Sequence, residues 1–154
     1  MNLLDHFVLK HLQLSLVNAE LIKVSRKPAQ QEARLELNLT PRLMKADSGE
    51  EPPSYQVTAR LSCEGRSRDS GEPVFRARVG MEAVYEQIGG DPIDLAEFTS
   101  HHASLARQLY PLLQHELRLL LVRLGLEQIH LPFDLAARIE TPEGQVIEVS
   151  GAVH

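Results

Sequence analysis

Apolar and polar residues alternate along four stretches in the first part of the chain. The stretches are residues 7–17, 33–40, 55–63 and 75–85, and in each of them about every second position is apolar. A period of two residues is typical of a strand that buries one face. Polar segments rich in Gly, Pro and charged residues separate the stretches. The pattern therefore predicts a four-stranded antiparallel β-meander, within roughly residues 7–88, that has one solvated face.

The first stretch is less regular than the other three. Leu12, Leu14 and Leu16 alternate with polar residues, but residues 7–9 are all apolar. Such a run predicts a β-bulge or the start of the strand at that point. Residues 21–24 are predicted to continue the strand after a bend.

The period changes after the Gly-Gly-Asp-Pro sequence at residues 89–92. Apolar positions are then spaced by three and four residues, which predicts helix over residues 94–124. Asp94 is a suitable N-cap, and Gly125 is a suitable stop. Pro111 leaves two alternatives open: a kinked helix, or two helices that meet there. Together with the strands, this order of elements predicts an α+β fold.

Segment 105–126 carries apolar side chains on nearly all sides, and ten of its 22 residues are leucine. One set has the spacing of a single helix face and is predicted to lie on the sheet: Leu105, Leu109, Leu113, Leu117, Leu120 and Leu124. A second set lies largely off that face, and a single sheet of a 154-residue chain cannot cover it as well. The sequence therefore predicts a subunit interface, with helices packed between the sheets of different chains, at Leu119, Leu121, Val122 and Leu126.

The last part of the chain has no single interpretation. Residues 141–144, Thr-Pro-Glu-Gly, are a strong turn signal, and residues 145–149 alternate like a strand. Segment 134–149 is therefore either a short helix followed by a strand or a β-hairpin. We treat residues 1–154 as one domain with a variable C-terminal element at 133–154.

Composition narrows the class of protein. The 154 residues are 43% hydrophobic and 24% charged, which is typical of a globular domain. A net charge of −5 argues against a nucleic-acid partner. No run of 18 apolar residues occurs, and the first residues lack the features of a signal peptide. We therefore expect a cytoplasmic protein without membrane insertion.

Motifs for catalysis or cofactor binding are lacking. The seven histidines do not have metal-ligand spacing, and the one cysteine, Cys63, lies in the apolar row of a strand. The chain has no nucleophile-elbow or phosphate-loop motif. We therefore expect no enzyme activity, no cofactor and no metal site. Arginines on the polar strand faces either line a groove or form an ordinary solvated face: Arg34, Arg60, Arg76 and Arg78.

Residues 74–135 resemble the SecB family of export chaperones. The resemblance rests on motifs in a fixed order: Val74-Phe75 and Val79, then Leu109-Tyr110-Pro111, Arg123, Gly125, and residues 128–134, Gln-Ile-His-Leu-Pro-Phe-Asp. Leu124 separates the arginine and glycine that are adjacent in the family, and the loop from proline to phenylalanine is shorter here.

The resemblance implies a fold, an assembly and partners. It implies a four-stranded sheet with a long helix, in a homotetramer that is a dimer of dimers with helices at its centre. It also implies binding of unfolded preproteins and their transfer to the motor protein SecA. In the family, acidic residues on the first and fourth strands dock SecA. The aligned positions here are Gln13, Val17, Arg76 and Arg78, so the docking surface has lost its acidic character.

We therefore expect an ATP-independent holdase that binds unfolded or preprotein chains through an apolar groove. Pairing with a sheet edge and broad apolar contacts can hold an extended peptide without requiring a particular sequence. The candidate peptide-binding residues are Tyr85, Phe98, Tyr110, Leu112, Leu113 and Phe133. The alternatives are an oligomeric carrier of a small apolar ligand and a scaffold protein without chaperone activity.

Overall fold

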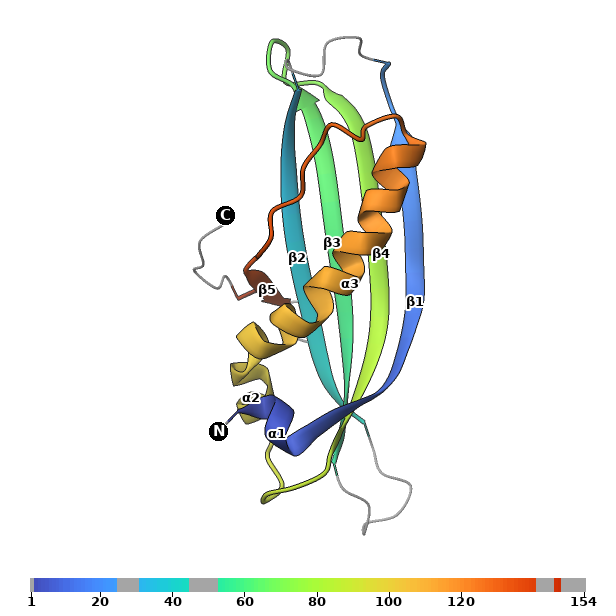
Figure 1. The fold of residues 1–154 in the computed structure, drawn as a ribbon. Helices are drawn as coiled ribbons and strands as arrows, with labels where there is room; N and C mark the ends of the chain where they lie inside the picture. Colours follow the sequence, from blue (N-terminus) through green and yellow to red (C-terminus); the bar gives the residue numbers. More distant parts are fainter. Residues whose placement is uncertain (1, 25–30, 45–52, 141–145, 148–154) are drawn as a thin grey trace.

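The computed structural model describes residues 2–24, 31–44, 53–140 and 146–147. In this part of the chain, a long twisted sheet carries a helix across one face (Figure 1). The elements in chain order are α1 (Leu3–His6), β1 (Phe7–Leu21), β2 (Gln31–Met44), β3 (Ser54–Ser67), β4 (Pro73–Gln87), α2 (Leu95–Ser100), α3 (His102–Arg123), β5 (Ala137–Glu140) and β6 (Val146–Ile147).

The α+β class is as predicted, but the order of the strands is not that of a simple meander. The sheet order is β1-β4-β3-β2-β5-β6. Strands β2, β3 and β4 are antiparallel neighbours in sequence order, whereas β1 pairs with β4 at the far edge. The alternation of apolar residues determines which face of a strand is buried, but it carries no information about neighbouring strands. The meander prediction therefore holds for β2 to β4 and is wrong for β1.

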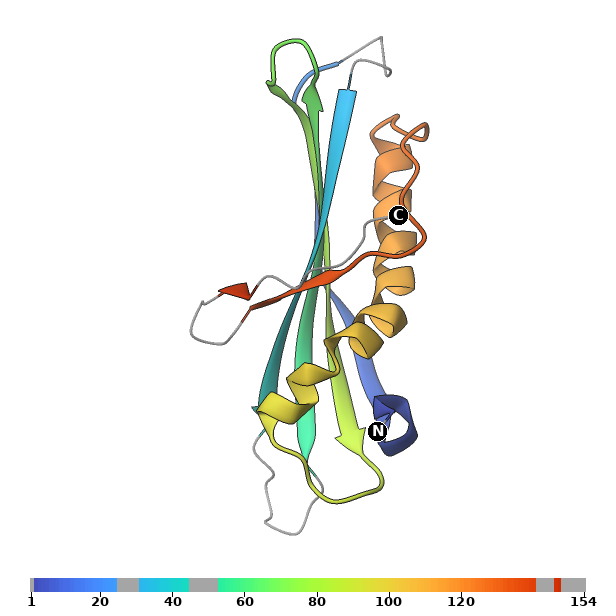
Figure 2. The same ribbon diagram turned by 90° about the vertical axis from the view of Figure 1, so that its left-hand side faces the viewer.

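The core lies between the sheet and the helix, which form two layers (Figure 2). Alternate residues of β3 are buried from Tyr55 to Cys63, and those of β4 are buried from Phe75 to Gln87. Leu105, Leu109, Leu113 and Leu117 on α3 are fully buried above them. Each large apolar side chain buried in this way stabilises the fold by roughly 1.5–3 kcal/mol.

Two register shifts bend β1, between Leu9 and His11 and between Leu14 and Leu16. The first confirms the predicted bulge. The second was not predicted, and it moves Leu16 to the opposite face, where it pairs with Gly80. With both shifts, an entirely apolar row shares the helix side with the buried residues of β4: Phe7, Leu9, Leu12, Leu14, Val17, Ala19 and Leu21.

Helix begins at the predicted N-cap. The Asp94 carboxylate oxygen Oδ1 accepts a hydrogen bond of 2.8 Å from the backbone N–H of Glu97. The break between α2 and α3 falls at His101, and α3 continues through Pro111. The alternative of two helices that meet at the proline is therefore wrong. Figure 2 shows the helix changing direction along its length, which agrees with a proline that removes one backbone hydrogen bond.

The C-terminal end of α3 is a Schellman motif. Gly125 has φ +74°, its N–H donates to the Val122 carbonyl, and the N–H of Leu126 donates to the Leu121 carbonyl. The reversal brings Leu126 back over Leu121, and both side chains are buried. The prediction that these two leucines lie away from the core is therefore wrong. Leu121 lies one turn after Leu117 and continues the buried face.

The last described strands form a hairpin, which is one of the two predicted alternatives. β5 runs parallel to β2 and antiparallel to β6. Arg138 Nη1 donates to Glu36 Oε1 over 2.6 Å and ties β5 to β2. The predicted turn at 141–144 lies outside the described residues.

Candidate polypeptide-binding and assembly surfaces

Strand β1 forms one edge of the described sheet. It pairs with β4 on one side, and no described strand pairs with its other side. Its apolar row is poorly covered: Leu14 is 47% exposed, Val17 52% and Leu21 40%. A long open edge with apolar side chains pairs readily with another chain. This edge is therefore a candidate binding surface.

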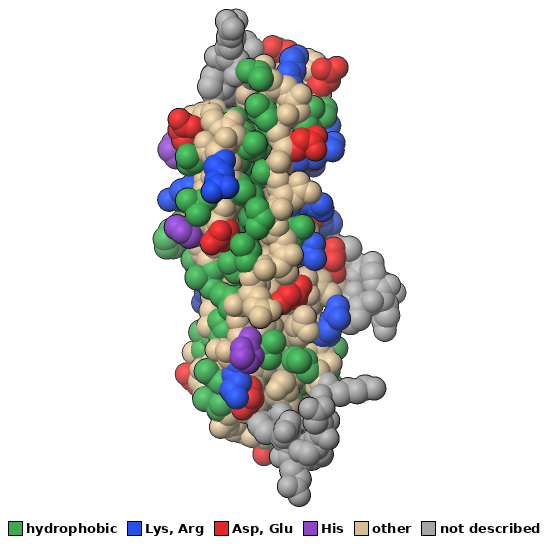
Figure 3. Space-filling model, turned by 90° about the vertical axis from the view of Figure 1, so that its right-hand side faces the viewer, with side chains coloured by type: hydrophobic (Ala, Val, Ile, Leu, Met, Phe, Trp, Pro, Cys, Tyr) green, Lys and Arg blue, Asp and Glu red, His purple; other side chains and the backbone are tan. Residues whose placement is uncertain are grey.

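The outer side of α3 carries a second apolar row. Leu112, Leu119 and Val122 are spaced by seven and three residues, which places them along one side of the helix. They are 39%, 49% and 52% exposed, respectively. Figure 3 faces the β1 side of the molecule and shows hydrophobic side chains gathered in a band along much of its length. We call the two rows together the β1–α3 surface: Leu12, Leu14, Val17, Leu21, Leu112, Leu119 and Val122.

Two of the predicted peptide-binding residues belong to an aromatic cluster inside the core. Phe98 stacks on Tyr55, with ring centroids 4.2 Å apart and an interplanar angle of 8°. Tyr85 lies 6.0 Å from Phe98 by ring centroids, and its hydroxyl donates to Gln108 Oε1 over 2.7 Å. Burial raises the pKa of Tyr85. Both Tyr85 and Phe98 are fully buried, so in this conformation they offer no surface to a ligand.

Two further predicted residues on α3 are buried, and one of them contacts the segment that links α3 to β5. We call residues 127–136 the strap. Leu113 is fully buried, and Tyr110 is almost so. The Tyr110 hydroxyl donates to the Pro132 carbonyl over 2.6 Å, and Gln114 Nε2 donates to the same carbonyl over 3.1 Å. Burial is the main cause that raises the pKa of Tyr110 to about 12. These two hydrogen bonds fix the strap on the helix.

Phe133 follows this attachment point and faces solvent. It is 86% exposed, more than any other large apolar side chain in the described part of the chain. Ile129 and Leu131 of the same strap are partly buried against the core. An exposed ring next to a fixed carbonyl is a suitable anchor for an apolar ligand. Of the six predicted peptide-binding residues, Leu112 and Phe133 are thus the two that the structure exposes.

The described residues include no site for metal chemistry. Nowhere in the described ranges do three or more His, Cys, Asp or Glu side chains lie close enough to hold a metal ion. Cys63 is buried, and burial raises its pKa to about 12, so its thiol stays protonated at neutral pH. None of the helices in these ranges is long and apolar enough to cross a membrane.

Four antiparallel strands followed by a long helix that crosses one face of the sheet form a SecB-like fold. The chain is similar to a solved structure of the Mycobacterium tuberculosis Rv1957 SecB-like chaperone in complex with a ChAD peptide from the Rv1956 HigA1 antitoxin. The two sequences are 21% identical, the TM-score is 0.57, and the match covers 84% of this chain and 91% of that chain. No family model and no curated protein matches this chain.

Proposed function

We propose that this protein is an ATP-independent holdase that binds unfolded polypeptides and suppresses their aggregation. The observation that carries the proposal is Phe133, a phenyl ring that is 86% exposed on a strap attached to α3 by two hydrogen bonds. The similar solved structure is a chaperone with a bound peptide, which supports a polypeptide ligand. A chain without a nucleotide motif would release its client by dissociation or to a partner.

A second copy of this chain is the proposed occupant of the β1–α3 surface. Strand β1 spans 15 residues, and its open edge can pair with the same edge of another copy around a two-fold axis. The exposed Leu119 and Val122 on α3 extend that surface, so one partner covers both rows. Two such dimers are proposed to pair further and form the dimer of dimers.

The client is proposed to bind at the strap, with Phe133 as its anchor. The strap that carries this ring runs from the C-terminal end of α3 away from β1 and toward β5, which lies next to β2 (Figure 1). The ring is therefore proposed to remain available when a second copy covers the β1–α3 surface. Apolar contacts with few specific hydrogen bonds do not select a particular sequence, so they suit clients of varied sequence. A segment of an antitoxin is one client class to test, because the similar chaperone was solved with such a peptide.

Transfer of clients to SecA is not part of the proposal. Gln13, Arg76 and Arg78 lie on the sheet face away from the helix, where the resembling family carries acidic docking residues. Val17 lies on the helix side instead, since it pairs with the buried Val79. These four aligned positions therefore lack the negative charge on which that docking depends.

Aggregation of a slow-folding client after dilution from denaturant tests the holdase proposal. We expect the wild-type protein to suppress light scattering at near-stoichiometric amounts. Phe133→Ser should raise the concentration for half-suppression roughly tenfold, because burial of a phenyl ring contributes roughly 1.5–3 kcal/mol. Ile88→Ser is the matched control, because Ile88 is 63% exposed but belongs to neither proposed surface.

Three outcomes contradict the proposal in different ways. Wild-type protein that protects none of several clients would favour the carrier or the scaffold. Equal loss in the Phe133 and Ile88 variants would show that the strap is not the client site. A Phe133 variant with unchanged protection would show the same, provided that thermal unfolding confirms its fold.

A further inference from the structure

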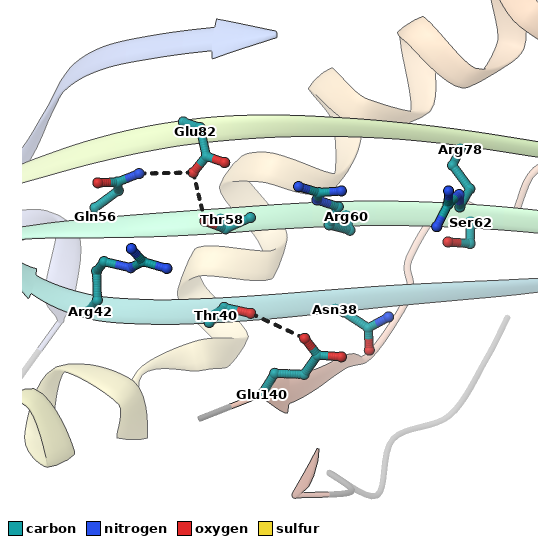
Figure 4. A pocket seen from close by; sticks show the side chains of 10 residues that line it. All are labelled: Asn38, Thr40, Arg42, Gln56, Thr58, Arg60, Ser62, Arg78, Glu82 and Glu140. Atoms are coloured by element: carbon teal, nitrogen blue, oxygen red, sulfur yellow. Dashed lines mark hydrogen bonds between the residues drawn. The ribbon is translucent and has the colours of Figure 1, made fainter. Parts of the chain in front are cut away.

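Three arginines lie in a polar hollow on the sheet face opposite α3. Arg42 on β2, Arg60 on β3 and Arg78 on β4 line a hollow of about 470 Å³ together with polar residues of these strands and Glu140 of β5 (Figure 4). A second hollow of about 390 Å³ shares Ser62 and Arg78 with the first. The two hollows therefore form one elongated polar surface.

These three guanidinium groups have no ionic partner among the described residues. Ion pairs on the same face involve other arginines: Arg66 and Arg76 contact Glu64, and Arg138 contacts Glu36. The two carboxylates in the hollow accept hydrogen bonds from neutral groups. Glu82 accepts from Thr58 over 2.6 Å and from Gln56 over 3.1 Å, and Glu140 accepts from Thr40 over 3.4 Å. Three arginines against two carboxylates leave the described lining of this hollow with a net charge of +1, in a chain whose net charge is −5.

The backbone leaves room for the central arginine. A Cβ atom on Gly80 would lie 3.2 Å from both Cδ and Nε of Arg60. The Arg60 side chain therefore packs directly over the glycine. Arg60 and Gly80 are direct partners in the β3–β4 register. A Cβ atom at this position would require the Arg60 side chain to shift by a few tenths of an ångström.

The strand register spaces the arginines along a line. Arg42 pairs with Gln56, four residues before Arg60 on β3, and Arg78 pairs with Ser62, two residues after it. At about 3.4 Å per residue, these steps are roughly 14 Å and 7 Å along the strands. Side chains at alternate positions of an extended peptide recur every ~7 Å. The line therefore matches the side chains of an extended segment better than it matches one compact anion.

The hollow also offers acceptors that a simple anion cannot use. Asn38 Oδ1 is buried and has no hydrogen-bond partner among the described residues. The carboxylates of Glu82 and Glu140 are further acceptors in the same hollow. Peptide N–H groups can donate hydrogen bonds to these atoms, whereas a fully ionised phosphate has no donor to offer them.

We propose that the outer sheet face binds an extended acidic segment of a partner protein, with Arg42, Arg60 and Arg78 contacting its carboxylates. Arginine pairs well with carboxylates through its planar set of donors. The site lies on the opposite face of the sheet from α3 and the strap, so it is separate from the proposed client site. A partner is thereby recognised by its negative charge while the helix side holds a client.

Fluorescence anisotropy with a labelled eight-residue peptide of alternating Glu and Ser tests this site. The wild-type protein should bind the peptide saturably, and binding should weaken as salt is raised from 50 to 300 mM because charge pairs are screened. Arg60→Gln and Arg78→Gln should each weaken binding roughly fivefold to tenfold. Arg107→Gln, which removes an exposed positive charge on α3, should change it less than about twofold.

Circular dichroism checks that each variant folds, and if one arginine variant fails this check, the other decides. Equal binding of a peptide with Lys in place of Glu would overturn the proposal. Equal weakening by Arg107→Gln would also overturn it, because only net charge would then matter. Displacement of the peptide by inorganic tripolyphosphate at equal charge concentration would assign the hollow to small anions instead.

Discussion

Burial keeps two ionisable side chains of the core in their neutral forms. Cys63 and Tyr110 are both almost fully buried, and burial raises the pKa of each to about 12. Their ordinary pKa values are 9.0 and 10.0. At a pH between these ordinary values and about 12, the two groups lose their protons in the unfolded chain but keep them in the folded chain. Stability from these groups is therefore complete below about pH 9 and falls as the pH rises toward 12.

Urea unfolding at pH 8 and pH 10.5 measures this effect. The free energy of unfolding should be lower at pH 10.5, with about 1–2 kcal/mol of the decrease due to Cys63. Cys63→Ala removes that titration, so the variant should lose less stability between the two pH values than the wild type, whatever its stability at pH 8. The same decrease in both proteins would show that the thiol ionises freely in the folded state.

At the scale of the element, the end of α3 depends on one glycine. Gly125 has φ +74°, a conformation that side chains with a Cβ atom adopt at a cost of about 1 kcal/mol. Gly125→Ala should therefore lower the free energy of unfolding by about 1 kcal/mol, measured by urea denaturation. Arg123→Ala, two residues earlier and exposed, is the control and should change it by less than about 0.5 kcal/mol. Equal effects of the two substitutions would contradict the role of the Schellman motif.

The elements that the sequence predicts well are those governed by local periodicity. Strands β2 to β4, the N-cap at Asp94 and the stop at Gly125 all follow from residue spacing and caps. The second bulge of β1 could not be predicted in this way, because Leu14 and Leu16 alternate as in a regular strand. Only pairing with β4 reveals that Leu16 has changed faces.

The candidate site was harder to predict than the fold. Aromatic composition selected Tyr85, Phe98 and Tyr110 as ligand contacts, but aromatic rings also fill cores, and all three are buried. Which face of a helix is left uncovered depends on the width of the sheet beneath it. The apolar row of β1 is exposed because β1 lies at the edge of the sheet. The alternation of its residues does not predict that edge position.

At the scale of the whole molecule, the two faces of the sheet have different chemistry. The helix side continues from the core to the exposed β1–α3 surface, whereas the outer face carries charged and hydroxyl side chains. A holdase needs an apolar surface that does not cause its own aggregation. The proposed assembly through part of that surface would meet this need, since pairing would remove the open edge of β1.

Two substitutions on α3 test which surface holds the assembly together. Leu119→Lys combined with Val122→Lys places two charges on the exposed row and should dissociate the oligomer, whereas Arg107→Gln should leave its mass unchanged. Leu119 and Val122 are each about half exposed, so the folded subunit should tolerate both substitutions. An oligomer that survives the double substitution would show that α3 does not face the partner copy.

The central claim is that a second copy covers the β1–α3 surface. The mass of the wild-type protein in solution, measured by light scattering after gel filtration, tests it most directly. We predict two or four times the 17.2 kDa of the chain at micromolar concentration. A mass of 17.2 kDa at every concentration tested would contradict the account.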